Sequence, residues 1–258
     1  MKLLRFELDG EVSMGELQGD AIWRLTGDLM HLTRRPAAPP VRLDAVRLLS
    51  PVEPSKVMAV GPNYRAHLKG GPTPHRPYYW VKPSTALNHP EGQIRLPGGE
   101  VPVNHESELA IVIGKSARAV APAAALEYVL GYTCINDVSL GEMNDLPKYF
   151  ASRELVDGKI CDGFAPLGPL IETRLDTSDL RIRCRVNGAT RQDHRTSDMI
   201  WNPRQLVSMI SHVVTLLPGD VIASGSPPGV SPLHGGDVVE VEVEGIGILR
   251  NFVVDGAA

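Results

Sequence analysis

Two glutamates stand one residue apart at the start of an apolar run, in the stretch NHESELAIVIG that covers residues 104–114. In a strand, residues i and i+2 point to the same face, so Glu106 and Glu108 are expected to project together, with Ser107 opposite. Asp137 ends a second apolar segment, YTCIND. Three carboxylates at the ends of neighbouring buried strands would form an oxygen-rich site that selects magnesium, manganese or calcium over zinc.

The same residues also permit a purely structural interpretation, in which the glutamates lie on a solvated strand end and Asp137 lies in a turn. E-x-E is a common pattern, and like charges this close raise each other's pKa unless a cation lies between them. The sequence lacks the motifs of nucleotide-binding sites (GxGxxG and GxxxxGK[ST]), of zinc proteases (HExxH) and of serine hydrolases (GxSxG). The glycine- and proline-rich GSPPG at 225–229 either presents backbone N–H groups or forms a tight turn.

Six short segments, taken in order, resemble the motifs of the fumarylacetoacetate hydrolase superfamily from about Lys56 to Val254. They are KVMAVGPNYRAHLKG, YYWVKPSTAL, HESELAIVIGK, YVLGYTCINDVS, GKICDGFAPLGP and LLPGDVIASGSPPGV. The resemblance implies an α+β fold that is rich in strands: a mixed β-sandwich or rolled pseudo-barrel with peripheral helices. It also implies a dimer that binds Mg²⁺ or Mn²⁺, with Ca²⁺ as a further candidate, and that acts on 2-oxo acids or their enols.

The resemblance also assigns roles to individual residues. Glu106, Glu108 and Asp137 would be the metal ligands, with Lys159 beside metal and substrate. His67 would be the general base or would position a water. Ser226, where the family usually has threonine, would hold a substrate carboxylate together with backbone N–H groups such as that of Gly225. The remaining expected substrate-binding positions are Asn63, Tyr64, Lys82 and Ser84, of which Asn63 and Tyr64 could instead only shape their loop.

Two departures from the family pattern bear on the reaction. Gly70 occupies the position, three residues after His67, where members that cleave C–C bonds often carry a glutamate, and the stretch from Ser139 to Glu142 lacks the usual arginine–aspartate pair. Hydrolysis needs an oriented water, whereas tautomerisation needs only proton transfer. The sequence therefore favours a metal-dependent isomerase of a 2-hydroxy-dienoate or 2-oxo-enoate acting through a metal-chelated enolate.

The closest resemblance is to the branch of 2-hydroxyhepta-2,4-diene-1,7-dioate isomerase/decarboxylases in homoprotocatechuate degradation. One alternative is a C–C hydrolase or decarboxylase of an acylpyruvate or oxaloacetate, with Glu142 or another loop acid replacing the missing glutamate. A second alternative is an inactive keto-acid-binding protein.

The elements that must position these residues are mostly short strands. Residues 1–50 are expected to form a small N-terminal β subdomain, and residues 51–258 the catalytic domain. Helical spacing predicts a helix in residues 121–133 that ends at Gly131, and another in 197–216 that is capped by Ser197 or Asp198.

The composition narrows the choice of partners and compartment. A net charge of −4 argues against nucleic-acid binding. No apolar run approaches the length of a membrane helix, and the first residues read as a strand, not a signal peptide. Three cysteines without a CxxC pattern suit a reducing compartment. We expect a cytoplasmic homodimer with a small-molecule substrate.

Overall fold

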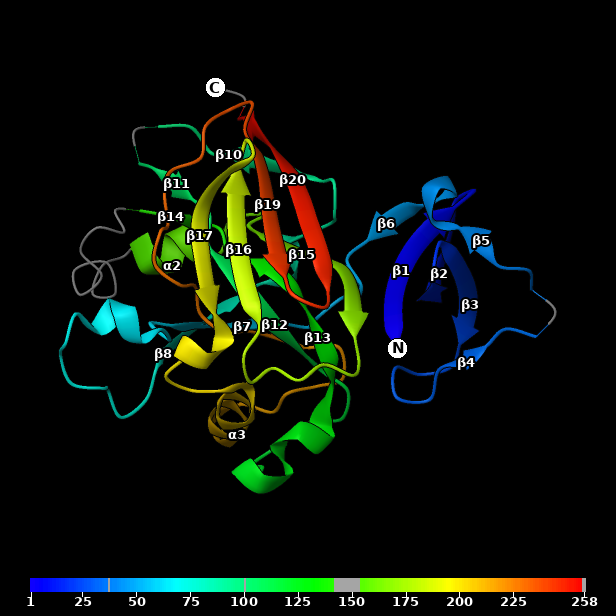
Figure 1. Cartoon of the computed structure of the whole chain (residues 1–258), viewed down its shortest axis with the longest axis horizontal. Coiled ribbons are helices and arrows are strands. Elements are labelled where there is room, and N and C mark those ends of the chain that lie inside the picture. Colours follow the sequence, from blue (N-terminus) through cyan, green and yellow to red (C-terminus); the bar gives the residue numbers. More distant parts are fainter. Residues whose placement is uncertain (37, 100, 142–153, 257–258) are drawn as a thin grey trace.

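The computed structural model describes residues 1–36, 38–99, 101–141 and 154–256, and β-strands dominate them (Figure 1). The largest sheet among these residues has 13 strands. Its main path runs β4 (Thr33–Arg34), β3 (Ala21–Thr26), β2 (Glu11–Gln18), β1 (Lys2–Leu8), β15 (Ala165–Glu172), β13 (Val129–Asn136), β12 (Ser107–Ile113), β18 (Val221–Ala223), β7 (Val57–Gly61) and β8 (Tyr78–Lys82). Three strands pair outside this path: β5 (Val41–Arg42), β6 (Arg47–Leu49) and β9 (Leu87–Asn88).

A second sheet of five strands packs against the middle of the first. Its order is β10 (Gln93–Leu96), β20 (Gly247–Asp255), β19 (Val238–Val243), β16 (Arg181–Val186) and β17 (Ala189–Arg195). A two-stranded pair is formed by β11 (Val103–Asn104) and β14 (Ser139–Leu140).

Helices are short and peripheral. The α-helices in the described residues are α2 (Glu154–Lys159) and α3 (Pro203–Val213), and the 3₁₀ turns are η1 (Leu43–Ala45), η2 (Arg65–Leu68), η3 (Ser84–Ala86), η4 (Pro122–Tyr128) and η5 (Thr196–Asp198). The expected strand-rich α+β fold is confirmed.

Strand β12 lies in the centre of the molecule and is buried along its whole length. Its odd-numbered residues, such as Leu109 and Ile111, pack in the same cluster as Ile182 and Val241 of the five-stranded sheet. Its even-numbered residues face the other way, where Ala110 packs in a different cluster. Burial on both faces explains why the sequence of this strand is nearly continuously apolar.

The strands β1 to β6 form the part of the large sheet that lies to one side in Figure 1. They join the rest through β1, whose Lys2 and Leu3 pair with Glu172 and Ile171 of β15. Leu3 is buried in the same cluster as Ile171, so the joint is apolar as well as hydrogen-bonded. The division into residues 1–50 and 51–258 stays a proposal.

Two details of the expected helices are wrong. The chain makes only the 3₁₀ turn η4 before entering β13, and Gly131 lies inside that strand, where a Cβ would come within 2.6 Å of the Glu172 carbonyl oxygen. Close strand pairing, not helix capping, is therefore what this glycine serves. The helix α3 starts later than predicted, because Asn202 forms its capping box with Gln205.

In the portion of the chain that the structure describes, no helix is long and apolar enough to cross a membrane.

Candidate metal centre

The paired strands β12 and β13 bring the three predicted carboxylates together. Their antiparallel register sets Ser107 opposite Asn136. One residue beyond this pair, the Asp137 amide donates to the Glu106 carbonyl at 3.0 Å. One carboxylate oxygen from each of Glu106, Glu108 and Asp137 lies within 4.8 Å of the others, and all three residues are buried. Strand alternation directs Ser107 to the opposite face, where its side chain donates to Gln192.

Two buried lysines face this cluster. The Lys159 ammonium donates to Glu106 Oε1 at 2.6 Å and to Asp137 Oδ2 at 2.8 Å. The Lys82 ammonium lies 2.7 Å from Asp137 Oδ1 and donates to the Val138 carbonyl at 2.9 Å. Burial opposes ionisation of Asp137, but the two ammonium groups outweigh it and hold the pKa of this carboxyl below its ordinary value. Three carboxylates and two ammonium groups leave one negative charge uncompensated.

Glu108 carries that excess charge. Its Oε2 accepts the Gly225 N–H at 2.7 Å, but its buried Oε1 has no hydrogen-bond partner in the described part of the chain. Burial, together with the negative charges of Asp137 and Glu106, raises the pKa of Glu108 well above its ordinary value. Burial likewise raises the pKa of Glu106, against the pull of Lys159. An orphaned carboxylate oxygen among hard oxygen donors suits a divalent cation such as Mg²⁺ or Mn²⁺.

The loop after β18 brings Ser226 and His67 together. The His67 ring donates from Nε2 to the Ser226 carbonyl oxygen at 3.0 Å, which leaves Nδ1 as the unprotonated nitrogen of the neutral ring. Burial lowers the pKa of His67 below its ordinary value, with a smaller contribution from the charge of Lys69, so the neutral form prevails near pH 7. The ring therefore has the protonation state that a general base requires.

The other predicted substrate-binding residues are placed differently from one another. The Asn63 amide is buried and donates to the carbonyls of Trp201 and Ser224, while its oxygen accepts from the Trp201 amide, so it fastens backbone segments together. Tyr64 is buried, and its hydroxyl has no partner among the described residues. Burial and then the charge of Glu108 raise the pKa of that hydroxyl. Ser84 is exposed at the start of η3.

Two further side chains adjoin the centre that no specific pattern in the sequence had indicated. Gln192 of β17 is buried and donates to Ser226 Oγ at 2.8 Å. Trp80 of β8 has the Lys159 ammonium 5.0 Å from its ring centroid, a cation–π contact. Both come from strands remote in sequence from the carboxylates. In the sequence, Gln192 could have been noticed only as a polar residue at a buried position of an alternating strand.

Gly70, at the position where related sequences often carry a glutamate, has a left-handed φ of +82° and open space around it. His67 therefore has no carboxylate from that position. Glu142, the acid considered as a replacement, lies outside the described residues.

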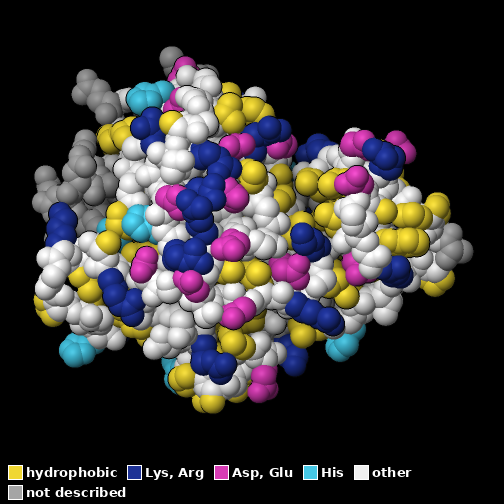
Figure 2. Space-filling model, in the orientation of Figure 1, with side chains coloured by type: hydrophobic (Ala, Val, Ile, Leu, Met, Phe, Trp, Pro, Cys, Tyr) yellow, Lys and Arg dark blue, Asp and Glu magenta, His cyan; other side chains and the backbone are white. Residues whose placement is uncertain are grey.

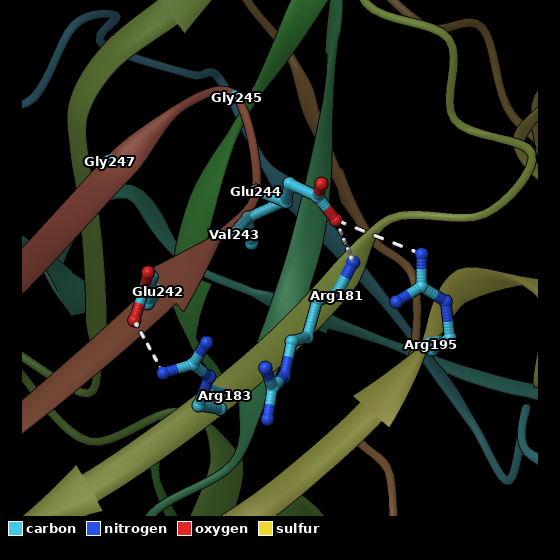
Figure 3. Close-up of a pocket in the computed structure, with 8 residues that line it drawn as sticks. All are labelled: Arg181, Arg183, Arg195, Glu242, Val243, Glu244, Gly245 and Gly247. Carbon is cyan, nitrogen blue, oxygen red and sulfur yellow. Dashed lines mark hydrogen bonds and ion pairs between the residues drawn. The ribbon is translucent and has the colours of Figure 1, made fainter.

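A separate hollow lies on the outer face of the five-stranded sheet and is lined by arginines and glutamates (Figure 3). Arg183 Nη1 lies 3.6 Å from Glu242 Oε2, and Arg195 Nη2 lies 3.8 Å from Glu244 Oε2. Figure 2 shows Lys/Arg and Asp/Glu side chains interspersed along this face of the molecule. Because these charges pair with one another, the hollow has the character of a solvated sheet face.

Comparisons with known proteins agree with this geometry. The family model for the C-terminal domain of fumarylacetoacetate hydrolase matches residues 56–254, and a model named Rv2993c-like, N-terminal, matches residues 1–51. An oxaloacetate tautomerase from Bos taurus, FAHD2A, is 37% identical over an alignment of 222 residues that covers 81% of this chain and 70% of the relative.

Solved structures are similar over the whole chain. A 5-carboxymethyl-2-hydroxymuconate delta-isomerase from Mycobacterium smegmatis is 42% identical, with a TM-score of 0.88 and complete coverage of both chains. A maleylpyruvate hydrolase from Sphingobium sp. SYK-6, in complex with manganese and pyruvate, is 30% identical, with a TM-score of 0.81 and complete coverage of both. The chain therefore belongs to the fumarylacetoacetate hydrolase family.

Proposed function

We propose that this protein is a divalent-metal-dependent isomerase that moves a proton within a 2-hydroxy-dienoate or a related 2-oxo-enoate. Glu106, Glu108 and Asp137 would hold Mg²⁺ or Mn²⁺. The observation that carries the proposal is the buried trio of carboxylates with one orphaned oxygen, together with His67, whose neutral ring contacts the loop that also binds Glu108 and has no carboxylate partner among the described residues. We further propose that it works in the cytoplasm as a homodimer.

Each protein group has a distinct part in this reaction. A bound divalent cation would supply Lewis-acid charge to the carboxylate and 2-oxo oxygens of the substrate. Ser226 and neighbouring backbone N–H groups would hold the substrate carboxylate, and Lys159 would add positive charge where negative charge develops on the 2-oxo oxygen. The lone pair of His67 Nδ1 would accept the 2-hydroxyl proton of a 2-hydroxy-dienoate, or a C3 proton of a 2-oxo acid, and would return it to another position of the same enolate, so that no atom is lost or gained.

The relatives support a proton transfer more than a cleavage. Two of them are named as an oxaloacetate tautomerase and a 5-carboxymethyl-2-hydroxymuconate delta-isomerase, and both names describe the rearrangement of a substrate without a break in its carbon chain. A second candidate, C–C hydrolysis or decarboxylation of an acylpyruvate or oxaloacetate, is supported by the similarity to the maleylpyruvate hydrolase.

One experiment distinguishes the two reactions. Protein loaded with Mn²⁺ is incubated in D₂O with 2-hydroxyhepta-2,4-diene-1,7-dioate, with enol-oxaloacetate and with an acylpyruvate, followed by ultraviolet absorbance and proton NMR. An isomerase incorporates deuterium at C3 or C5 of the product and changes the absorbance without releasing pyruvate. Rapid pyruvate release from the acylpyruvate without isomerisation of the dienoate would favour the hydrolase instead. The Glu106→Gln variant serves as the metal-site control and should be inactive.

A further inference from the structure

Gln192 connects the five-stranded sheet to both halves of the candidate site. It lies on β17 with 1% of its surface exposed. Its Oε1 accepts from the Ser107 amide at 3.1 Å, from Ser107 Oγ at 2.9 Å and from His105 Nδ1 at 3.1 Å. Its Nε2 donates to Ser226 Oγ at 2.8 Å and to the Pro227 carbonyl at 2.6 Å. One side chain thus ties the strand that bears the carboxylates to the loop that bears Ser226.

The orientation of this amide is fixed by partners that cannot exchange roles. A backbone N–H can only donate, so the atom facing the Ser107 amide must be the oxygen of Gln192. A carbonyl can only accept, so the atom facing Pro227 must be the nitrogen. The two contacts give the same assignment, and the Gln192 N–H group therefore points at Ser226.

The direction of the Ser226 hydroxyl follows from that assignment. Because Ser226 Oγ receives an N–H from Gln192, its own proton must point elsewhere. The acceptor within reach in the described chain is the Pro227 carbonyl at 3.4 Å, which is long for an O–H···O bond and which already receives the Gln192 N–H. A carboxylate oxygen of a bound substrate would be a stronger acceptor for this proton.

We infer that Gln192 is a positioning residue that presents Ser226 as a hydrogen-bond donor and so makes the site select a carboxylate over a neutral amide. The inference rests on the proposed function, in which Ser226 holds the carboxylate of a 2-oxo acid. With an acid at position 192, the residue loses the amide N–H that points at Ser226, and the serine proton turns toward the new carboxylate. Ser226 then offers a lone pair to the substrate, which suits an amide N–H and repels a carboxylate.

The test compares pyruvate with pyruvamide, which differ in that one group. Both are titrated by calorimetry into full-length protein loaded with Mn²⁺, after separate measurement of Mn²⁺ affinity and thermal unfolding for each variant. The unchanged protein should prefer pyruvate. Gln192→Glu should lower the ratio of pyruvate to pyruvamide affinity roughly tenfold or more, the usual effect of losing a hydrogen bond to a charged group. Ser226→Ala should lower the ratio by a similar factor.

Matched variants separate this role from simple structural damage and from the added charge. Asp193→Asn replaces a carboxylate with an amide on the same strand, at a residue that pairs with Arg181 on the outer face of the sheet. This variant should leave the ratio of pyruvate to pyruvamide affinity unchanged. A merely structural role would weaken both ligands equally. In the double variant Gln192→Glu/Ser226→Ala, the effect of Gln192→Glu on the ratio should vanish.

Two results would overturn the inference while leaving the proposed function intact: persistence of the Gln192→Glu effect in the Ser226→Ala background, or a full preference for pyruvate in Ser226→Ala alone. The second also decides the matter if Gln192→Glu does not fold. If the unchanged Mn²⁺-loaded protein binds pyruvate no better than pyruvamide, the proposed recognition of a 2-oxo acid fails, and the inference fails with it.

Discussion

At the scale of single residues, the site is set by an imbalance of buried charge. Lys159 and Lys82 satisfy Asp137 and one oxygen of Glu106, while Glu108 keeps an oxygen with no described partner. Isolated buried charge is costly, so a protein retains it where something else compensates it. A divalent cation would provide that compensation.

The variant Glu108→Gln should therefore separate stability from metal binding. Its amide oxygen can still accept the Gly225 N–H, but one buried negative charge is gone, so the metal-free variant should unfold at a higher temperature than the unchanged protein. The gain should grow as pH rises above the ordinary glutamate pKa of 4.5, because the carboxyl ionises first in the unfolded chain. Mn²⁺ at a hundredfold excess over Kd should stabilise the unchanged protein by about 2.7 kcal/mol and the variant by much less.

Thermal unfolding with and without Mn²⁺, at several pH values, measures both effects. Glu106→Gln is the matched comparison, because Glu106 also has a raised pKa but pairs with Lys159, so its gain in metal-free unfolding temperature should be smaller than that of Glu108→Gln or absent. A Glu108→Gln protein that gains no more than Glu106→Gln would contradict the interpretation of Glu108 as the uncompensated charge.

If His67 is the general base, kcat/KM should depend on pH. A base must be unprotonated to accept a proton, so kcat/KM should be level above the lowered pKa of His67 and should fall as pH decreases through it, at a midpoint below 6.5. His67→Asn should reduce kcat/KM by roughly 10²- to 10⁴-fold and remove this acidic limb. His75→Asn, at an exposed histidine in the loop between η2 and β8, is the control. An acidic limb that survives in His67→Asn would assign the base to another group.

At the scale of elements, the loop after β18 carries more of the site than its turn-like sequence suggests. Gly225 has a φ of +98°, its amide donates to Glu108, and a Cβ there would lie 2.6 Å from the Cβ of Asn63. The sequence permitted either presented backbone N–H groups or a tight turn, and the Gly225 N–H that donates to the buried Glu108 agrees with the first alternative. What it did not reveal is that Asn63 fastens this loop to the segment before α3.

Gly225→Ala is expected to damage both stability and metal binding. Gly236 has a similar φ of +90° with open space around it, so Gly236→Ala measures the cost of the left-handed backbone alone, roughly 1 kcal/mol. Gly225→Ala should cost about 1–3 kcal/mol more, through the clash with Asn63, and should also weaken Mn²⁺ binding. Denaturant unfolding and Mn²⁺ titration of both variants provide the comparison. Equal losses in the two variants would show that the close approach to Asn63 has no energetic consequence.

At the scale of the whole molecule, the strands of residues 1–50 join the rest of the chain through a short edge. None of the hydrogen bonds described at the carboxylates, at His67 or at Ser226 involves residues 1–50. The described hydrogen bonds of the site are thus made without the N-terminal part, which pairs with the large sheet at β15. This arrangement agrees with the proposal that residues 51–258 form the catalytic domain.

A chain of residues 51–258 is accordingly expected to fold with reduced stability, because it exposes the β15 edge and the apolar surface that Leu3 covers. It should bind Mn²⁺ within a few-fold of the affinity of the full chain. Circular dichroism, Mn²⁺ titration and solution mass measure these properties, and the full chain should have about twice its chain mass of 27.9 kDa if it is a homodimer. A truncated chain that does not fold, or that folds without binding metal, would contradict the two-domain proposal.

From the sequence alone, the candidate residues for the chemistry and the strand faces that they occupy could be inferred. Alternation directed Glu106 and Glu108 to one side, Asp137 ended the adjacent strand, and the ordered motifs indicated the family. Helix boundaries were less well predicted, since the pairing of β13 with β15 overrode the helical spacing before Gly131. Strand periodicity is a local property, which is why these features could be read directly.

How those faces meet depends on the tertiary packing. Lys82 is 55 residues from Asp137 and Gln192 is 34 residues from Ser226 in the sequence, yet each pair is in direct contact. These contacts arise because β8 lies at the edge of one sheet and β17 belongs to the other, and no local pattern encodes which strands become neighbours. The packing of the two sheets thus left Glu108 uncompensated and directed the Gln192 amide at Ser226.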